Sequence, residues 1–586
     1  MAEVLLSPGV LARENDQSFI TAQPIQAGAA ILGPTVKGPV GIPTVVTSFS
    51  DYKNRFGCIV ESGSRSYTYL TSISAYNYFQ QGGDSLLVTR VVSGSYTPAN
   101  SSTIQVDAGN TGIINSDTSQ SLVLETLTEG AIANSSGSFV SGSLSNGTKD
   151  NLRWEIVSPN TASGTFSLLI RQGNDTPNNK VILETWPNLS MDPNSSQYVA
   201  KVIGDSKQAV ATDGGESYLE YTGSYANASR YVRVKSVDTP TLNYFDNLGN
   251  AKSALMSSIP IAQSGSFGNA SGTPFVGMAA TFYDKIGTST NTQGLASVNY
   301  AASLQLLANQ DLYQYNLITA PGLIREVTSD ATQLTTMVDN AQTRGDNLAV
   351  IDLAKYNSTL LNITTKAAGV DSSYATTYWP WLQTIDPDTA ENVWVPASTM
   401  IPGVYAFNDR STEAWFAPAG LNRGGLTTVI RAERNLTNGN RNELYSNNIN
   451  PIATFPNTGV VVFGQKTLQK KASALDRVNV RRLLIALKNY ISQIADQLVF
   501  EQNTKATRNN FLSQVNPYME SVQQRQELYA FKVVMDDSNN TPDVIDRNQL
   551  VGQIFVQPTR TAEFIYLDFN IQPTGATFDG SGGGAY

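Results

Sequence analysis

The sequence predicts a mixed α/β and α+β multidomain protein, in which an α/β core carries an inserted antiparallel β-rich domain and is followed by a C-terminal α+β domain with extended terminal arms. Its 586 residues correspond to roughly three to five domains. Strand and helix patterns alternate on both sides of a stretch rich in Gly, Ser, Thr and Asn that holds only short strand patterns. Towards the C-terminus, before the glycine-rich tail, the sequence has the pattern of an amphipathic helix followed by strands with alternating apolar and polar residues.

These shifts in pattern divide the chain into six segments. We expect an N-terminal arm over residues 1–20, the first part of the α/β core over 21–92, the inserted β-rich outer domain over 93–240, the rest of the core over 241–465, a C-terminal α+β domain over 466–571 and a flexible C-terminal arm over 572–586.

The N-terminal part combines an aperiodic start with a buried strand. The short apolar run at residues 4–10 ends in a turn and is followed by residues without helical or strand periodicity, which favours an extended arm. Residues 29–32 and 44–46 are typical of strands, and residues 67–79 carry apolar side chains at helical spacing. The run at 85–92 predicts a buried strand of an α/β layer.

The inserted segment is polar, acidic and rich in turns. Short strand patterns recur at residues 122–124, 153–157, 166–171 and 180–185, with the spacing of an antiparallel sandwich or barrel. Over 93–240 there are 9 Lys or Arg and 14 Asp or Glu, so the net charge is 9 − 14 = −5. A solvated β domain fits this composition.

The second half of the core repeats the strand–helix alternation. A strand at 315–318 leads into the loop Ala320-Pro321-Gly322, an amphipathic helix over 330–344 and a strand over 347–352. This order favours a partly parallel sheet. The aromatic and proline-rich residues 374–418 are too irregular to assign.

The C-terminal part has the strongest periodicity. Residues 479–500 form an amphipathic helix with one apolar stripe, and a second helix follows in which Pro517 must cause a kink or a restart. Strands are expected at 529–535, 550–556 and 563–571, and the glycine-rich end is typical of a flexible tail.

Composition excludes most enzyme chemistry. The chain has no histidine and one cysteine, so it lacks imidazole-based triads, disulfides within the chain and thiolate zinc sites; Cys58 is expected to be a small buried residue. Phosphate-binding glycine motifs are absent, and we expect no cofactor, no metal and no catalytic residue. The net charge of −9 argues against nucleic-acid binding, and no apolar run predicts membrane insertion or secretion. Paired carboxylates remain the one catalytic option.

A basic stretch interrupts this acidic chain. Residues 464–510 contain nine basic and three acidic residues, a net charge of 9 − 3 = +6. One interpretation is an ordinary solvated helix face. The other is a stripe that docks onto an acidic partner surface.

Several ordered motifs resemble a known family. They include Leu6-Ser7-Pro8-Gly9-Val10, Tyr378-Trp379-Pro380-Trp381, Ile449-Asn450-Pro451, Asp476-Arg477-Val478-Asn479-Val480-Arg481-Arg482, Val499-Phe500-Glu501-Gln502-Asn503, Asn540-Thr541-Pro542-Asp543 and Gln557-Pro558-Thr559-Arg560. In order and spacing the chain resembles the tail sheath proteins of contractile-tailed (myovirus-type) bacteriophages over roughly 1–92 and 300–571. Residues 93–240 match less well, as expected of the variable outward domain of that family.

The resemblance implies a structural protein and not an enzyme. Copies would polymerise as stacked hexameric rings around the tail tube, and contraction would drive the tube through the host envelope without ATP. Implied partners are further copies of the chain, the tail tube protein, and the baseplate and tail terminator proteins, with no nucleic acid and no membrane insertion. The protein would be assembled in the host cytoplasm and would reside in the virion tail.

Two sets of site residues follow from the resemblance. The C-terminal domain would lie nearest the tube, so the tube-facing basic stripe would comprise Lys470, Lys471, Arg477, Arg481, Arg482 and Lys488. The inter-subunit arms would comprise Val4, Leu5, Leu6, Gln572, Pro573 and Thr574.

Three alternatives stay open at this point. Arg481 and Arg482 could instead be paired inside the subunit, for instance with Asp476 or Glu501. The whole protein could be an adhesive tail or fibre component, for which the β-rich insertion is the best argument. It could also be a carboxylate-based glycosidase.

Overall fold

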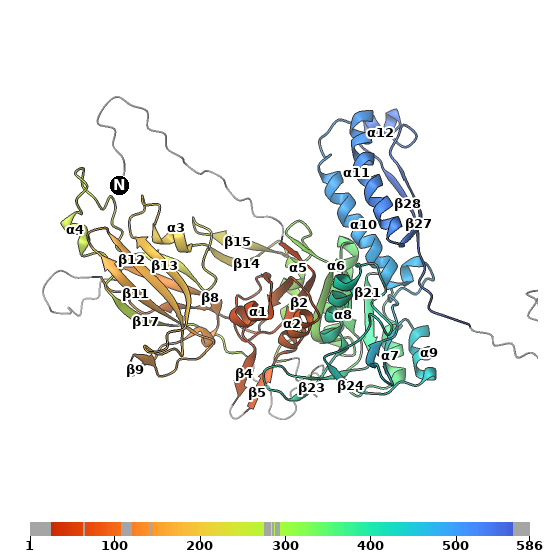
Figure 1. The fold of residues 1–586 in the computed structure, drawn as a ribbon, viewed down its shortest axis with the longest axis horizontal. Coiled ribbons are helices and arrows are strands. Elements are labelled where there is room, and N and C mark those ends of the chain that lie inside the picture. Colours follow the sequence, from red (N-terminus) through yellow and green to blue (C-terminus); the bar gives the residue numbers. More distant parts are fainter. Residues whose placement is uncertain are drawn as a thin grey trace, which may run out of the picture. The chain divides into compact units, whose positions relative to one another are not determined.

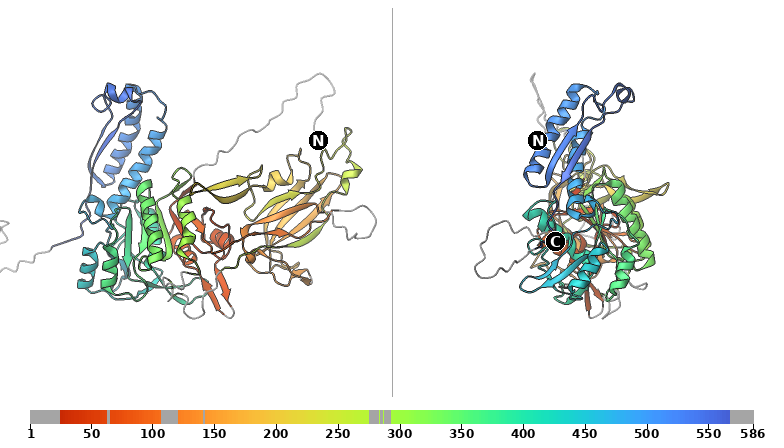
Figure 2. Two further views of the ribbon diagram at one scale, coloured as in Figure 1. Left: turned by 180° about the vertical axis from the view of Figure 1, so that it is seen from behind. Right: turned by 90° about the vertical axis from the view of Figure 1, so that its right-hand side faces the viewer.

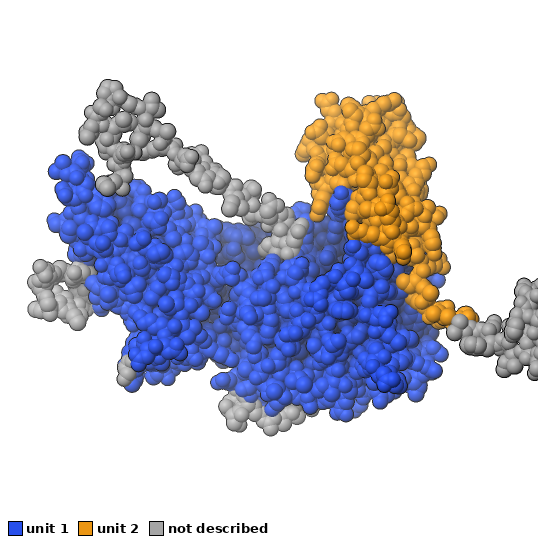
Figure 3. All heavy atoms as spheres, in the orientation of Figure 1, with its two compact units in different colours: residues 1–490 blue, residues 491–586 orange. Residues whose placement is uncertain are grey.

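The computed structural model describes residues 25–62, 65–106, 120–140, 142–274, 283, 286 and 293–566. Two compact units divide the chain, residues 1–490 and 491–586 (Figure 3). The boundary falls inside helix α10 (Val478–Asp496) and therefore later than the expected position 466. The reason is that Val478 and Ile485, in the first half of this helix, are buried in the core of the first unit.

The centre of the first unit is an eight-stranded sheet in the order β26-β25-β21-β20-β19-β2-β6-β3 (Figure 1). Its strands are β2 (Ala29–Gly33), β3 (Thr44–Val46), β6 (Leu86–Arg90), β19 (Leu317–Ile324), β20 (Leu348–Asp352), β21 (Ala375–Trp379), β25 (Asn450–Phe455) and β26 (Gly459–Val462). Neighbouring strands from β25 to β6 run parallel, and only the edge strands β26 and β3 pair antiparallel. The prediction of a partly parallel sheet is confirmed.

Helices cover this sheet, which explains why its central strands are apolar throughout. They are α1 (Phe49–Phe56), α2 (Leu70–Gln80), α5 (Ala301–Leu306), α6 (Thr328–Arg344), α7 (Leu360–Ala367), α8 (Ala397–Ser411) and α9 (Asn438–Ser446). Helices α2 and α8 pack against each other and against β19, and the Asn77 amide of α2 donates to the Met400 carbonyl of α8 over 2.8 Å. Helix α6 packs on β19 and β20.

Strand β19 departs from the expectation of a loop at residues 320–322, because it runs through Pro321 and Gly322. Its register with β20 shifts between Thr319 and Ile324, so Pro321 lies where no ladder hydrogen bond is required of it. The unassigned region 374–418 contains β21, α8 and two strands, β22 (Leu382–Ile385) and β23 (Asn392–Val395). These two strands and β24 (Val429–Ala432) form a sheet in the order β23-β22-β24.

Two small sheets lie at the start of the first unit. Strand β1 (Ile25–Ala27) pairs parallel with β18 (Tyr313–Tyr315), and β4 (Ile59–Ser62) forms a hairpin with β5 (Arg65–Thr68). Cys58 is buried beside β4, as expected for a small apolar residue.

The insertion forms an antiparallel seven-stranded sheet in the order β13-β12-β11-β17-β7-β8-β16. Its strands are β7 (Pro98–Ser101), β8 (Leu122–Glu129), β11 (Leu152–Asn160), β12 (Thr165–Gln172), β13 (Ile182–Ser190), β16 (Val232–Val237) and β17 (Gln263–Gly268). Because β17 pairs with both β7 and β11, the insertion extends past the expected end at residue 240. Smaller elements complete it: β9 (Phe139–Val140), β10 (Ser143–Leu144), α3 (Val199–Ile203) and α4 (Ser253–Met256).

A hairpin of the insertion, β14 (Lys207–Asp213) and β15 (Glu216–Thr222), lies apart from the seven-stranded sheet. Both ribbon views show it between that sheet and the core (Figure 1 and Figure 2). Val210 and Leu219 pack against the hydrophobic cluster of the core, and the Ser217 hydroxyl donates to the Gln305 side chain of α5 over 2.9 Å. The insertion is therefore attached to the core by this hairpin as well as by its connecting segments.

The second unit comprises the end of α10, then α11 (Lys505–Gln524), β27 (Leu528–Val534), α12 (Pro542–Asp546) and β28 (Gln553–Pro558). Of the two expected effects of Pro517, a kink or a restart, the restart does not occur: α11 continues through Pro517 as one helix and buries Phe511, Val515 and Met519. Helix α10 ends at Asp496, before the expected residue 500. Residues 563–566 form no strand, and the rest of the strand expected at 563–571 lies outside the described residues.

Candidate functional site

The basic stretch of the sequence contains two arginines that the fold buries. The Arg482 side chain is 4% exposed, and its two terminal nitrogens donate to both Asp409 carboxylate oxygens at 2.8 and 2.5 Å. Its guanidinium also lies 4.7 Å from the centre of the Tyr405 ring. Burial alone would lower the pKa of Arg482, but the Asp409 charge outweighs it and the pKa is raised. Arg482 is therefore a charged group held permanently inside the subunit.

Arg481 is buried beside Tyr374. Its guanidinium lies 4.0 Å from the centre of the Tyr374 ring and donates to the Ser373 hydroxyl over 2.6 Å. Burial lowers the pKa of Arg481, and the neighbouring tyrosine opposes that shift. The expectation that Arg481 and Arg482 lie on an exposed polar face is wrong. Ser373 and Asp409, the latter on helix α8, bind these two side chains of α10.

Three of the other four members of the predicted stripe also have partners. Arg477 forms an ion pair with Asp476 at 3.0 Å, and the Lys488 ammonium donates to the Tyr374 hydroxyl over 3.2 Å. The Lys470 ammonium donates to the Ala368 carbonyl over 2.6 Å. Lys470, Lys471 and Lys488 remain exposed, so a basic surface of three lysines replaces the stripe of six residues. Their contact with a tube stays a prediction.

The partners of the arginines were not found by sequence reasoning. Asp409 follows Tyr405 by four residues on α8, so both side chains lie on one face of that helix. The hydroxyls of Tyr405 and Tyr378 are 2.7 Å apart and hydrogen bonded, which links β21 to the same cluster. The spacing of Tyr405 and Asp409 was the available signal, but nothing local connects it with Arg482, 73 positions later.

The predicted arm residues Val4, Leu5, Leu6, Gln572, Pro573 and Thr574 lie outside the described residues. The described residues do include a sheet to which a further strand could be added. Strands β27 and β28 form a sheet of two, and within the described chain neither outer edge pairs with a further strand. Tyr529 and Phe555 are exposed on this pair.

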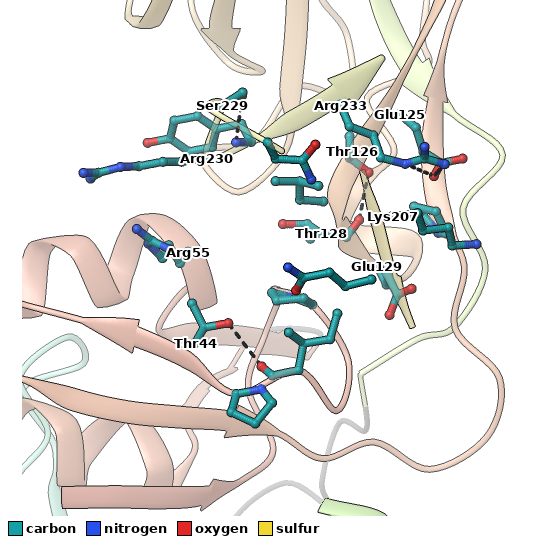
Figure 4. A pocket seen from close by; sticks show the side chains of 18 of the residues that line it. Thr44, Arg55, Glu125, Thr126, Thr128, Glu129, Lys207, Ser229, Arg230 and Arg233 are labelled. Carbon is teal, nitrogen blue, oxygen red and sulfur yellow. Dashed lines mark hydrogen bonds and ion pairs between the residues drawn. The ribbon is translucent and has the colours of Figure 1, made fainter. Parts of the chain in front are cut away.

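A cavity of about 470 Å³ lies between the core and the insertion (Figure 4). The Glu129 carboxylate accepts a hydrogen bond from the Val40 amide at 3.1 Å, and burial raises its pKa. Arg90, buried at the end of β6, donates to the carbonyls of Gly38 and Glu129 at 2.6 and 2.7 Å. Polar contacts of this kind join the end of β8 to the core.

The carboxylates of the cavity do not form a catalytic pair with free groups. Glu125 lies 2.6 Å from Arg233 and 3.4 Å from Lys235, both on β16. Across the described residues no cluster of three metal-ligating side chains occurs. In the same part of the chain no helix combines the length and apolarity needed to cross a membrane. The cavity thus has the contacts of a structural junction.

Family models match the chain after the insertion. Residues 296–468 match the phage tail sheath protein central domain, and residues 470–572 match the phage tail sheath C-terminal domain. These ranges contain β19 to β26 of the core and the whole described second unit.

Curated relatives agree with the family models. The chain is 39% identical over 218 residues to the tail sheath protein of Vibrio phage KVP40, and 35% identical over 224 residues to that of Enterobacteria phage T4. These matches cover 37% and 38% of this chain, and 31% and 33% of the two relatives. The chain therefore spans about a third of the length of the curated relatives it matches.

The match to solved structures of sheath proteins has lower sequence identity. A sheath tail protein from Listeria innocua is 10% identical with a TM-score of 0.49, covering 91% of this chain and 95% of its own. The helical sheath of the anti-feeding prophage in its contracted state is 15% identical with a TM-score of 0.45, covering 97% and 99%.

Tail sheath proteins are structural components and not enzymes. The curated matches are 35% identical or more, and the two family models adjoin one another in the order of the fold. Over residues 296–468 and 470–572, the chain is therefore similar to the central and C-terminal domains of phage tail sheath proteins.

Proposed function

We propose that this chain is the structural subunit of a contractile phage tail sheath. Copies polymerise as stacked hexameric rings around the tail tube, and contraction drives the tube through the host cell envelope. The observation that carries the proposal is the continuous family match over residues 296–572, which joins half of the core to the C-terminal unit. The subunit is assembled in the host cytoplasm and becomes part of the virion tail.

Subunits are linked by their terminal arms in this proposal. Residues 4–6 or 572–577 of one copy add a strand to the β27–β28 sheet of a neighbour. Support comes from the two outer edges of that sheet, which lack a strand partner within the described chain. Backbone hydrogen bonds along an edge can hold a neighbour while rigid domains rotate, so such a link survives a change of lattice.

The tail tube contacts the exposed lysines. Lys470, Lys471 and Lys488 present positive charge near the junction of the two matched domains, and an acidic tube surface would complement them. The baseplate and the tail terminator contact the two ends of the polymer, and neither nucleic acid nor a membrane is a partner. The insertion faces outward, as its acidic composition and its position outside the matched ranges suggest.

Electron microscopy of the purified full chain tests the proposal. A sheath subunit should form tubes of uniform width, whereas an adhesive fibre component or a glycosidase should not. Deleting residues 1–16 should abolish the tubes and leave a folded monomer, because those residues supply the linking arm. Normal tubes from the truncated chain would contradict the arm linkage, and the absence of tubes from the full chain would contradict the function itself.

A further inference from the structure

Four arginines within 19 consecutive positions form no ion pair with a carboxylate of the described residues. Arg423, Arg431, Arg434 and Arg441, here called the arginine cluster, form no ion pair with any described residue. Each guanidinium instead stacks on an aromatic ring. The distances to the ring centres are 5.1 Å from Arg423 to Phe416, 5.3 Å from Arg431 to Trp394, 5.4 Å from Arg434 to Trp379, and 5.2 and 5.4 Å from Arg441 to Phe455 and Phe463. Stacking holds the charged forks in place without neutralising them.

Apolar side chains are exposed around this cluster. Leu421, Ile430 and Phe463 are 53%, 47% and 44% exposed, and Ile385 is exposed on the neighbouring strand β22. The only acidic residue between positions 421 and 441 is Glu433, and burial raises its pKa. Arginine, aromatic and aliphatic side chains together are the composition of buried protein–protein contacts. The cluster therefore has the chemistry of an interface for an acidic partner.

The complementary chemistry occurs on the same chain. Glu216, Tyr218 and Glu220 alternate along β15, so they share one face of the β14–β15 hairpin, and Asp213 lies directly across from Glu216. All four are exposed, and none of the three carboxylates forms an ion pair within the described residues. Lys207 is the only basic residue of the two strands. These four residues are here called the acidic hairpin face.

We propose that the arginine cluster of one copy binds the acidic hairpin face of a second copy. Among the described residues neither patch forms an ion pair in its own fold, and the two are complementary in charge and both contain aromatic side chains. Guanidinium and carboxylate groups form paired hydrogen bonds of high geometric specificity. Because two different patches meet, the contact is head-to-tail, and it closes into a ring or continues into an open polymer according to the rotation between copies. This inference rests on the proposed self-assembly and names one interface of it.

A charge swap within one chain tests the contact. The variant Arg431→Glu with Arg434→Glu and the variant Glu216→Arg with Glu220→Arg should each weaken self-association of the full chain about tenfold or more, because like charges then face each other. Combining all four changes in one chain should restore association to within about threefold of the original. Sedimentation velocity at about 0.1 M salt measures the association constants.

A matched control separates this contact from general charge effects. Lys201→Glu with Lys252→Glu reverses two exposed charges of the insertion outside both patches, and it should leave association unchanged. Thermal melting should show that every variant is folded, since the substituted side chains are exposed. The inference would be overturned, while the unaltered chain still forms tubes, by either of two results. One is normal self-association of the arginine-cluster variant or of the hairpin variant. The other is a combined variant whose self-association is not restored.

Two further outcomes are distinguishable. If the unaltered chain forms no tubes and stays monomeric, the proposed function fails and this interface fails with it. A fluorescent single-stranded oligonucleotide that binds the chain, and loses binding on Arg431→Glu with Arg434→Glu while self-association is unchanged, would assign the arginine cluster to nucleic acid and overturn the proposal.

Discussion

Replacing Arg482 with methionine should destabilise the first unit without touching any docking surface. The substitution removes a bidentate pair with Asp409 and leaves that carboxylate without its partner. Breaking a fully buried pair costs about 3–5 kcal/mol. The Asp409 side chain is 33% exposed and can be partly rehydrated, so we expect a loss of about 2–4 kcal/mol.

The shift in melting temperature follows from the size of the unit. At about 2.1 cal/mol/K per residue, unfolding a unit of 490 residues has an entropy of about 1 kcal/mol/K. The melting temperature of the first transition should therefore fall by about 2–4 °C in differential scanning calorimetry. Arg482→Glu should lower it further, because two carboxylates would then face each other in a buried site.

The double variant Arg482→Met with Asp409→Leu provides the control, because it removes both charges and leaves no buried group unpaired. It should be more stable than Arg482→Met alone. Lys471→Met, at an exposed position, should leave the melting temperature unchanged. An unchanged melting temperature of Arg482→Met, together with lost tube docking, would refute the assignment of Arg482 to the interior.

Three further predictions concern pH, the insertion and the tube. Burial raises the pKa of Asp352 to about 6, and hydrogen bonds from Ser398 only partly oppose it, so the folded state binds this proton more tightly than the unfolded state. Stability should therefore fall by about 2 kcal/mol as pH rises from about 4 to 6, and Asp352→Asn should remove that slope in urea titrations. Deleting residues 93–240 should give a protein that aggregates, because β17 loses both of its neighbouring strands. Deleting residues 94–273 should instead give a soluble chain with a lower melting temperature, since Val210 and Leu219 no longer cover the core. A soluble protein with an unchanged melting temperature from the first deletion would contradict this prediction. Lys471→Glu with Lys488→Glu should weaken binding to isolated tail tubes, and added salt should do the same to the unaltered chain; salt-independent binding in a co-sedimentation assay would rule out a charged interface.

The central residues of several helices and strands could be predicted from the sequence, because hydrophobic periodicity is a local property of the chain. Residues 29–32, 86–92 and 330–344 carry the periodicity of buried strands and of a one-sided helix, and the structure forms β2, β6 and α6 there. The strand order was not predictable in the same way. Strand β17 joins the inserted sheet from beyond the expected boundary because strand pairing is decided by contacts remote in sequence.

The basic stretch shows most clearly which properties the sequence determines and which the tertiary structure determines. The sequence alone predicted an amphipathic helix over residues 479–500, a cationic segment and motifs that resemble those of sheath proteins, because period, charge and motif order are properties of the chain itself. Only the tertiary structure decided which cations are exposed. Asp409 and Tyr374, remote in sequence, cover Arg482 and Arg481, whereas Lys488, one to two turns further along the same helix, stays in solvent. The physical reason is that a charged side chain is stable inside a protein when folding brings it a partner, and the partner's position is set by the packing of the whole unit.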